Sequence, residues 1–224
     1  MLWNTTSDPI RSVEFYRMFV QNPFGKLHTY QGAVVFGPPR EQGCEVLRIC
    51  NPAPTSEVLY ESLSKTHVGR LRERLIFVEW TRTEVMSAIQ AFCHQGLPLP
   101  DLFDDGVARL EGLTVFQLAC YQQTCLIPHG ETRSYAWLAE RLKKYGAERA
   151  VGGAMKANPF PLLMPCHRVV KKDGNLGGFM GTNSPDSWQL GLKRALLEIE
   201  GLHQQPSLFA FPGELATHST MTVQ

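Results

Sequence analysis

Short apolar runs separated by turn residues dominate residues 31–95 and predict a small sheet with one helix. The run 33–36 is apolar, glycine and two prolines follow it, and residues 44–50 then alternate apolar with polar, which predicts a β-hairpin. Residues 74–80 predict a third strand. Residues 83–95 carry apolar side chains at a helical spacing, at positions 85, 86, 89, 92 and 93, and predict a helix.

Proline, glycine and aspartate accumulate between residues 96 and 106 and interrupt both patterns. Domain boundaries commonly fall in linkers of this composition. We therefore expect an N-terminal α/β domain with its linker at residues 1–108 and a second domain at residues 109–201. Residues 202–224 show no periodicity and are expected to form a loosely ordered tail.

Helical spacing dominates the second domain, so the predicted fold class is α+β, a small sheet-plus-helix domain followed by a mostly helical one. Ser134 is a residue type that caps the start of a helix, and Gly146 is one that follows the last turn. Asn158-Pro159 ends the third helix, because the residue before a proline disfavours helical conformation. The predicted helices span residues 114–123, 135–144, 147–157 and 188–200.

The second and third of these helices flank a glycine turn, a pattern that a helix-turn-helix shares with any helical hairpin. Gly152 and Gly153 lie inside the third helix, where each glycine costs about 1 kcal/mol relative to alanine. Small residues there allow the close approach either of a neighbouring helix or of a sugar-phosphate backbone. Arg149 and Lys156, at the two ends of this helix, favour the backbone.

The composition is that of an ordinary globular protein, with 224 residues of which 43% are hydrophobic and 19% charged. No stretch approaches the roughly 18 apolar residues of a membrane span. The first eight residues lack the basic and apolar regions of a secretory signal. The six cysteines, none in a Cys-x-x-Cys pair, are therefore expected to be reduced thiols of an intracellular protein, cytoplasmic or nuclear.

The net charge of +1 conceals an uneven distribution. Residues 131–201 hold eleven basic and seven acidic side chains, an excess of four positive charges, and the rest of the chain is correspondingly acidic. A basic face suits a polyanionic partner, although a merely solvated surface gives the same count.

The strongest chemical signal is the tripeptide Cys166-His167-Arg168, which follows an apolar, proline-bearing run. A cysteine reacts as the thiolate, and neighbouring cationic or imidazole groups favour that form. The alternative is a buried, inert cysteine beside two polar residues, because free cysteine is among the most buried residue types. The glycine-rich loop 174–181 is suited either to lining a small-molecule or base pocket or to forming a simple turn.

Residues 112–201 resemble the O6-alkylguanine-DNA alkyltransferase family, also called methylated-DNA-protein-cysteine methyltransferases. The resemblance rests on several motifs in the family's order, whereas the first 100 residues share only a small sheet and a helix with it. The motifs are Phe116-Gln117, Ile127-Pro128-x-Gly130-x-Thr132-x-Ser134-Tyr135-x-x-Leu138-Ala139, Arg149-Ala150-Val151-Gly152-x-Ala154, Asn158-Pro159-x-Pro161, Pro165-Cys166-His167-Arg168-Val169 and Lys193-x-x-Leu196-Leu197-x-x-Glu200-Gly201.

The resemblance implies a ribonuclease H-like N-terminal domain and a winged-helix-like DNA-binding domain with a helix-turn-helix. It also implies direct-reversal DNA repair, in which a guanine alkylated on its exocyclic oxygen is flipped out of the duplex and its alkyl group passes to Cys166. The resulting thioether has no route back, so each chain reacts once. We expect a monomer that binds double-stranded DNA carrying alkylated guanine and needs no cofactor.

The same resemblance implies the catalytic roles. Cys166 is the nucleophile. His167 acts on it through a bridging water, because neighbouring side chains of an extended chain point to opposite faces, and Glu200 orients the imidazole. Tyr135 and Lys193 are candidates to neutralise the departing guanine, although Lys193 as an exposed helix residue is the alternative.

The resemblance further implies a DNA interface and a base pocket. Arg149 enters the base stack and fills the vacated space, and Tyr135 crowds the phosphate that rotates outward. Asn158 braces the turn before the active site, and main-chain groups read the extruded base. The other expected DNA contacts are Ala150, Gly152, Gly153 and Lys156, and the expected pocket and hinge residues are Asn158, Pro161, Met164, Val169, Phe179 and Met180.

The chain departs from the family pattern at the pocket. Phe179-Met180 stands where tyrosine and serine are common, Thr182 replaces a common glycine, and segment 182–190 is longer than usual. Met180 narrows the pocket and makes it more apolar, which bears on the tolerance for bulky adducts. Some members hold a structural zinc in the N-terminal domain, but the spacings of Cys44, Cys50, Cys93 and His94 match no zinc pattern, so we do not expect a metal.

Two other functions compete with alkyl transfer. A related, non-catalytic protein that binds alkylated DNA is the first, but in such proteins the nucleophile is replaced, typically by tryptophan, and Cys166 argues against it. A cysteine hydrolase that uses Cys166, His167 and Glu200 is the second. Adjacent cysteine and histidine form an awkward geometry for direct proton transfer, and the glycine-bearing helix would be unexplained.

Overall fold

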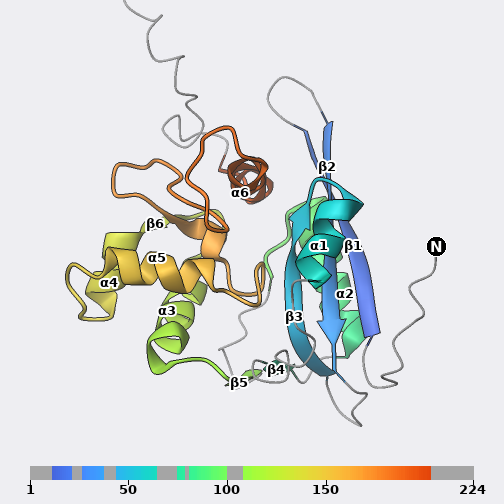
Figure 1. Ribbon diagram of the computed structural model, residues 1–224, viewed down its shortest axis with the longest axis horizontal. Coiled ribbons are helices and arrows are strands. Elements are labelled where there is room, and N and C mark those ends of the chain that lie inside the picture. Colours follow the sequence, from blue (N-terminus) through green and yellow to red (C-terminus); the bar gives the residue numbers. More distant parts are fainter. Residues whose placement is uncertain are drawn as a thin grey trace, which may run out of the picture.

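The computed structural model describes residues 12–21, 27–37, 44–64, 75–78, 81–99 and 108–202, and its architecture is α+β, as the sequence predicts. One antiparallel sheet has the strand order β1-β2-β3-β4-β5, and each strand pairs with the next (Figure 1). The strands are β1 (Ser12–Gln21), β2 (Leu27–Phe36), β3 (Cys44–Ala53), β4 (Leu75–Val78) and β5 (Ala108–Glu111).

The predicted hairpin is confirmed as β2 and β3, and the predicted third strand is confirmed as β4. Strand β1 was not anticipated because apolar side chains lie on both of its faces, with Met18 buried and Phe15 and Phe19 exposed, which hides the alternation. Strand β5 is only four residues long, too short for a periodic signal. Its pairing with β4 extends the sheet three residues beyond the expected boundary at 108.

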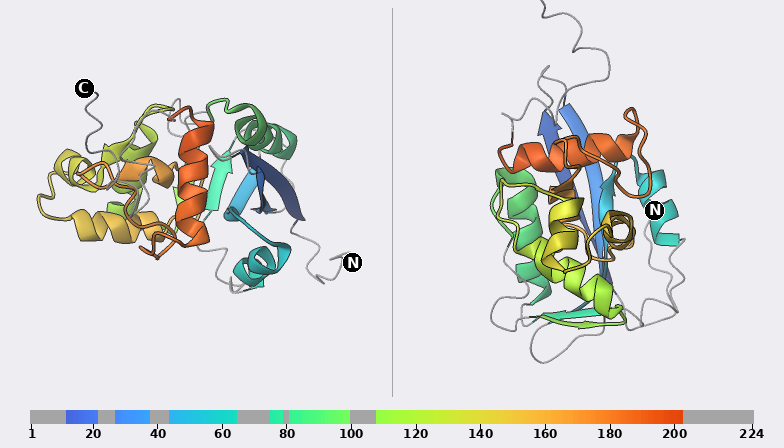
Figure 2. Two further views of the ribbon diagram at one scale, coloured as in Figure 1. Left: turned by 90° about the horizontal axis from the view of Figure 1, so that it is seen from above. Right: turned by 90° about the vertical axis from the view of Figure 1, so that its left-hand side faces the viewer.

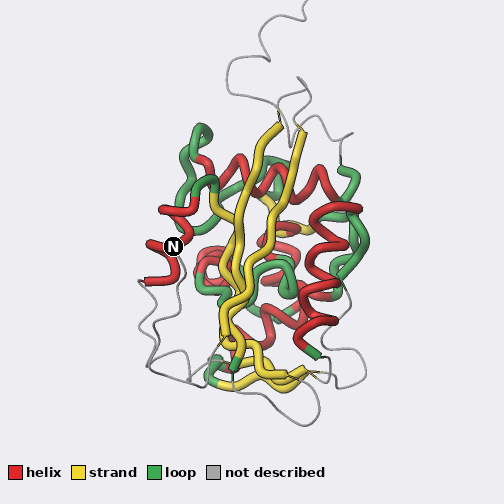
Figure 3. Tube along the Cα trace, turned by 90° about the vertical axis from the view of Figure 1, so that its right-hand side faces the viewer, coloured by secondary structure: helices red, strands yellow, loops and turns green. Residues whose placement is uncertain are grey.

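Two helices cover the sheet on opposite faces (Figure 2). Helix α1 (Ser56–Ser64) packs Leu59 against Ala33 and Cys50, and helix α2 (Arg82–Gln95) packs Phe92 and its neighbours against the other face. The sequence predicts α2 to within one residue, but not α1, which is only nine residues long. In Figure 3 the long strands run between helices that lie to either side of them.

Helix α2 has strong signals at both ends. The Thr81 hydroxyl accepts a hydrogen bond from the Glu84 main-chain N–H, and the Glu84 carboxylate accepts one from the Thr81 N–H, which forms a capping box. At the other end Gly96 adopts a left-handed conformation with φ of 65° and donates its N–H to the Phe92 carbonyl.

The second half of the chain is mostly helical. Ser134 caps α4 by accepting a hydrogen bond from the Trp137 N–H at 3.0 Å, as the sequence predicts. Two short parallel strands, β6 (Arg133–Ser134) and β7 (Val169–Val170), join the start of α4 to the residues after the cysteine motif. The helices are α3 (Val115–Cys125), α4 (Tyr135–Arg141), α5 (Glu148–Lys156) and α6 (Trp188–Ile199), with a 3-10 turn at Cys166–Arg168.

The predicted end of α4 is wrong by three residues. Lys143, not Gly146, takes the left-handed position after the last turn, with φ of 53°. The Lys144 N–H donates to the Ala139 carbonyl and the Lys143 N–H to the Glu140 carbonyl, the pair of hydrogen bonds that closes a Schellman motif. Gly146 is also left-handed, with φ of 77°, but it belongs to the following turn that leads into α5.

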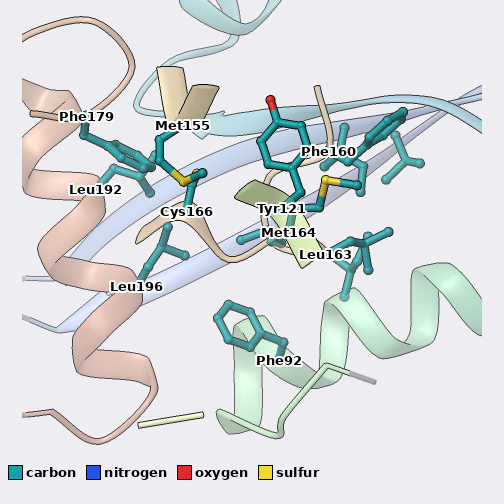
Figure 4. Packing of buried hydrophobic residues seen from close by; sticks show 14 of the residues in the cluster. Phe92, Tyr121, Met155, Phe160, Leu163, Met164, Cys166, Phe179, Leu192 and Leu196 are labelled. Atoms are coloured by element: carbon teal, nitrogen blue, oxygen red, sulfur yellow. The ribbon is translucent and has the colours of Figure 1, made fainter. Parts of the chain in front are cut away.

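One continuous hydrophobic core joins the sheet to the second half of the chain. Figure 4 shows Phe92 of α2 on the same core as Cys166 and Leu196. A main-chain hydrogen bond of 3.1 Å also crosses between the halves, from the Ile49 N–H of β3 to the Pro159 carbonyl. The segment that carries the cysteine is therefore seated directly on the sheet.

Three further observations concern the sequence-based expectations. All six cysteines lie in described ranges and carry free thiols. Each helix in the described ranges is too short or too polar to cross a lipid bilayer. The expected tail at 202–224 lies, except for its first residue, outside the described residues.

Candidate functional site

A cleft of about 400 Å³ lies between α5 and the loop 171–183, and Cys166 forms part of its wall. The cleft therefore joins the reactive cysteine to the glycine-bearing helix that precedes it in the sequence and to the glycine-rich loop that follows it. The predicted site residues that line it are Tyr135, Arg149, Gly152, Gly153, Lys156, Cys166, Phe179 and Met180.

The other predicted residues lie outside the cleft lining. Ala150 is exposed on α5 beside it. Asn158 is half-buried in the turn that precedes the cysteine, and the remaining residues are buried. These buried residues are Pro161, Met164, His167, Val169, Lys193 and Glu200.

Asn158 shapes the turn that delivers the cysteine. Its side-chain carbonyl accepts a hydrogen bond from the Phe160 N–H at 2.9 Å, and its amide donates to the Met164 carbonyl at 2.8 Å. Leu162 between them takes a left-handed conformation with φ of 74°. The Asn158 side chain thus supplies hydrogen bonds that the main chain of this turn cannot make, because its prolines have no N–H.

Cys166 begins a 3-10 turn, so the expectation that it stands in extended chain is wrong. The Cys166 N–H donates to the Met164 carbonyl, and the Arg168 N–H to the Pro165 carbonyl, which closes the chain into tight turns. Successive side chains of a 3-10 helix are about 120° apart, so Cys166 and His167 still diverge, for a different reason from the one the sequence suggested.

Burial raises the pKa of the Cys166 thiol above its ordinary value, although a hydrogen bond from the Asn158 side chain and the charge of Lys193 oppose the shift. The resting side chain is therefore a thiol. The expectation that the two following residues favour the thiolate is wrong for the resting protein, because His167 is neutral and Arg168 is paired elsewhere. A base must receive the proton when the sulfur reacts.

His167 and Glu200 form a buried pair, with 2.8 Å between Nε2 and Oε1. Burial lowers the pKa of His167 although Glu200 opposes the shift, so the imidazole is neutral. Burial alone would raise the pKa of the Glu200 carboxyl, but its interactions with His167 and Arg168 lower it to about 2. A carboxylate can only accept, so Nε2 carries the proton and Nδ1 has a free lone pair.

Arg168 holds the same carboxylate, a role that sequence reasoning did not assign to it. Its Nε donates to both Glu200 oxygens at 3.1 and 3.0 Å, its Nη2 donates to Oε1 at 3.0 Å, and its Nη1 donates to the Ile127 carbonyl. The Gly130 N–H also donates to Oε2 at 3.1 Å. The only signal for Arg168 in the sequence was its position in the tripeptide, and this position does not indicate that Glu200 is its partner.

Lys193 is fully buried, so the alternative of an exposed helix lysine is wrong. Its Nζ donates to the carbonyls of Val169 at 2.5 Å and Leu176 at 2.6 Å, and lies 3.4 Å from that of Gly178. Burial lowers the pKa of Lys193 to about 7, against the effect of Cys166. Lys193 thereby ties the segment after the cysteine to the loop that forms the cleft.

Tyr135 and Met180 complete the cleft near the sulfur. The Tyr135 hydroxyl donates to the Gly178 carbonyl at 3.2 Å, and burial, with a smaller effect of Cys166, raises the pKa of the phenol to about 12. Met180 lines the cleft from a left-handed conformation with φ of 49°, which non-glycine residues seldom adopt. The wall opposite α5 is therefore shaped by an unusual backbone.

The described residues contain no group of three or more His, Cys, Asp or Glu side chains placed to hold a metal ion. Cys44, Cys50 and Cys93 are buried in the sheet core. His94 is exposed on α2 and lies 3.1 Å from the Arg17 carbonyl.

Comparison with known proteins finds similarity over the second half of the chain. Residues 115–202 match the family model described as "6-O-methylguanine DNA methyltransferase, DNA binding domain". A methylated-DNA--protein-cysteine methyltransferase of Methanothermobacter thermautotrophicus is 40% identical over 100 residues, 45% of this chain and 52% of the relative. A DNA base-flipping protein of Thermus thermophilus is 46% identical over 90 residues, 40% of this chain and 55% of the relative.

The chain thus spans about half the length of the curated relatives it matches. A solved structure supports the fold over a longer range. The O6-methylguanine-DNA methyltransferase of the hyperthermophilic archaeon Pyrococcus kodakaraensis strain KOD1 aligns with 85% of this chain and 99% of its own, with a TM-score of 0.57 and 22% identity.

Proposed function

We propose that the chain repairs alkylated DNA by direct reversal, with residues 115–202, which match the family model, as its DNA-binding domain. It binds double-stranded DNA, flips out a guanine that carries an alkyl group on O6, and transfers that group irreversibly to Cys166. The observation that supports this best is the cleft, which joins the Cys166 thiol to the exposed face of α5.

The glycines of α5 support a nucleic-acid partner. A side-chain carbon added at Gly153 would meet no protein atom within 4 Å, and one added at Gly152 would meet only the Tyr135 ring at 3.9 Å. No described helix therefore requires these small residues for its own packing. The close approach of a sugar-phosphate backbone to α5 explains why these two positions are glycines. Arg149 is exposed beside them and can enter the base stack.

The buried pair below the cleft supplies the base. As the sulfur attacks the alkyl carbon, the S–C bond forms and the C–O bond to guanine breaks. The thiol proton passes through a water molecule to the free Nδ1 of His167, while the Glu200 carboxylate stabilises the resulting imidazolium. The Tyr135 phenol in the cleft wall donates its proton to the departing guanine anion and regains one from the His167 imidazolium through water, and Lys193 orders the loop from behind.

Finer assignments belong to the same proposal. The sheet domain is ribonuclease H-like and the helical domain is winged-helix-like, divided near residue 108, with α4 and α5 as the helix-turn-helix. The main chain around Cys166, Val169 and Met180 reads the extruded base. The protein acts as a monomer inside the cell, in the cytoplasm or nucleus, without a cofactor.

Incubation with a duplex that contains one O6-methylguanine tests the proposal. We expect the intact mass of the protein to rise by one methyl group, the adduct to map to Cys166, and the yield to stop at one equivalent of DNA. Repeated turnover would instead indicate a hydrolase. Binding without a change in mass would support a lesion-binding protein, the candidate favoured by the relative named a DNA base-flipping protein.

Replacing Arg149 by alanine is expected to slow the transfer about tenfold. The arginine side chain acts as a wedge in the base stack and offsets part of the few kcal/mol that unstacking the guanine costs. Single-turnover rates on the methylated duplex measure the effect. Exposed Lys144, in the turn before α5 and outside the cleft lining, provides the control Lys144→Ala, which should transfer at nearly the parental rate. Equal rates for Arg149→Ala and the parent would show that Arg149 does not act as the wedge.

A further inference from the structure

The end of α2, residues 92–96, contacts one member of the buried acid-base pair and the residue before the other, although α2 belongs to the sheet half of the chain. The ring of Phe92 is fully buried, and its centroid lies 6.2 Å from that of the His167 imidazole at an interplanar angle of 53°. The same ring meets His129 edge-on, with 6.3 Å between centroids. Figure 4 shows Phe92 projecting from its helix towards the core that holds Cys166.

Gly96 makes the second contact, at the last residue of α6 before Glu200. A side-chain carbon built on Gly96 would lie only 2.5 Å from the Ile199 carbonyl oxygen, a distance that real contacts do not reach. Gly96 also needs its left-handed φ of 65° to cap α2. Only glycine satisfies both requirements, so the end of α2 lies directly against the backbone that presents Glu200.

His167 and Glu200 reach each other from separate elements, the 3-10 turn and the end of α6. Their hydrogen bond fixes which imidazole nitrogen is free, so a small rotation of the ring or a shift of the carboxylate would misdirect the free lone pair. On the carboxylate side Arg168 and Gly130 hold the position. On the ring side the aromatic contact comes from Phe92.

From these contacts we propose that the end of α2 is a positioning element for the reaction at Cys166. Phe92 sets the plane of the His167 imidazole, and Gly96 sets how closely the end of α6 brings Glu200 to that ring. The sheet half of the chain thereby takes part in alkyl transfer without touching the DNA base. This inference rests on the proposed function for its rate measurement but not for its spectroscopic one.

The first test compares two left-handed glycines. Gly96→Ala introduces both backbone strain and the collision with Ile199, whereas Gly146→Ala introduces strain alone, because nothing lies within 4 Å of its new carbon. We expect Gly96→Ala to slow single-turnover methyl transfer by at least about tenfold, since displacements of about 1 Å at a catalytic group cost up to 100-fold. Because Gly146 lies in the turn before α5, the comparison uses saturating DNA, at which Gly146→Ala should transfer within about twofold of the parent. Gly96→Asn, which tolerates the left-handed conformation but keeps the collision, should fall with Gly96→Ala.

The second test reads the imidazole directly and decides the matter if Gly96→Ala does not fold. Phe92→Leu is compared with Phe36→Leu, an equally buried phenylalanine on the sheet. Nitrogen and proton NMR signals of the His167 ring should shift in Phe92→Leu and stay unchanged in Phe36→Leu. Methyl transfer should slow in Phe92→Leu and keep the parental rate in Phe36→Leu. Unchanged His167 signals in Phe92→Leu, or equal rates for Gly96→Ala and Gly146→Ala, would overturn the inference. If the parent takes up no methyl group, the proposed function fails, and the NMR comparison still decides the positioning role.

Discussion

Cys166→Ala is expected to abolish alkyl transfer completely while leaving the protein folded and able to bind duplex DNA. The sulfur is the atom that receives the alkyl group, so no residual chemistry remains without it. The side chain is only slightly larger than alanine and carries no charge in the resting protein, since burial keeps it protonated. Fluorescence anisotropy with a methylated duplex measures binding, and intact mass spectrometry measures transfer.

Cys125→Ala is the matched control, because Cys125 is half-buried and lies on α3 of the same half of the chain, outside the Cys166 cleft. It should gain one methyl group at the parental rate. A methyl adduct on Cys166→Ala, at Cys125 or elsewhere, would show that the sulfur at 166 is not the acceptor. Loss of DNA binding together with transfer would mean that Cys166 supports the interface rather than the chemistry.

Local signals account for the elements that the sequence predicted correctly. Helix α2 has a capping box and a terminal glycine, α4 has Ser134, and the sequence between the hairpin strands has glycine and two prolines. Each of these signals acts within a few residues. The errors occurred where packing overrides such signals. Lys143 takes a conformation that favours glycine, because the two hydrogen bonds that close α4 form at that position.

In the functional site, too, local signals were predictable and contacts set by packing were not. The tripeptide at Cys166 and the glycines of α5 are local signals, and Cys166, Gly152 and Gly153 line one cleft. The partners of Arg168 and Lys193 are carbonyls and a carboxylate that lie 15 to 41 residues away in the chain. The local sequence pattern does not predict these contacts. It does not predict the contact between Phe92 and His167 either, because only the assembled core brings the two rings together.

The buried network around Glu200 also has consequences for stability. Its carboxylate accepts hydrogen bonds from the His167 ring, from the Arg168 guanidinium and from the Gly130 N–H. Because the folded pKa lies near 2, below the ordinary value, the stability that the group contributes is present above the ordinary pKa of about 4.5. It is lost as the pH falls from there towards 2, when the folded protein also takes up the proton.

Glu200→Gln is therefore expected to lower the free energy of unfolding by about 3 kcal/mol at neutral pH, because it leaves the Arg168 charge buried without its counter-ion. It should also slow methyl transfer by about 100-fold, since a neutral amide neither stabilises the imidazolium nor fixes the proton on Nε2. Urea unfolding between pH 2 and 7 measures the first effect, and the variant should lack much of the parental loss below pH 4.5. Glu131→Gln, which removes the carboxylate from a half-exposed pair with Arg133, is the control and should cost less than about 1 kcal/mol. Equal stability of the two variants would show that the Arg168 charge is solvated, not held by Glu200.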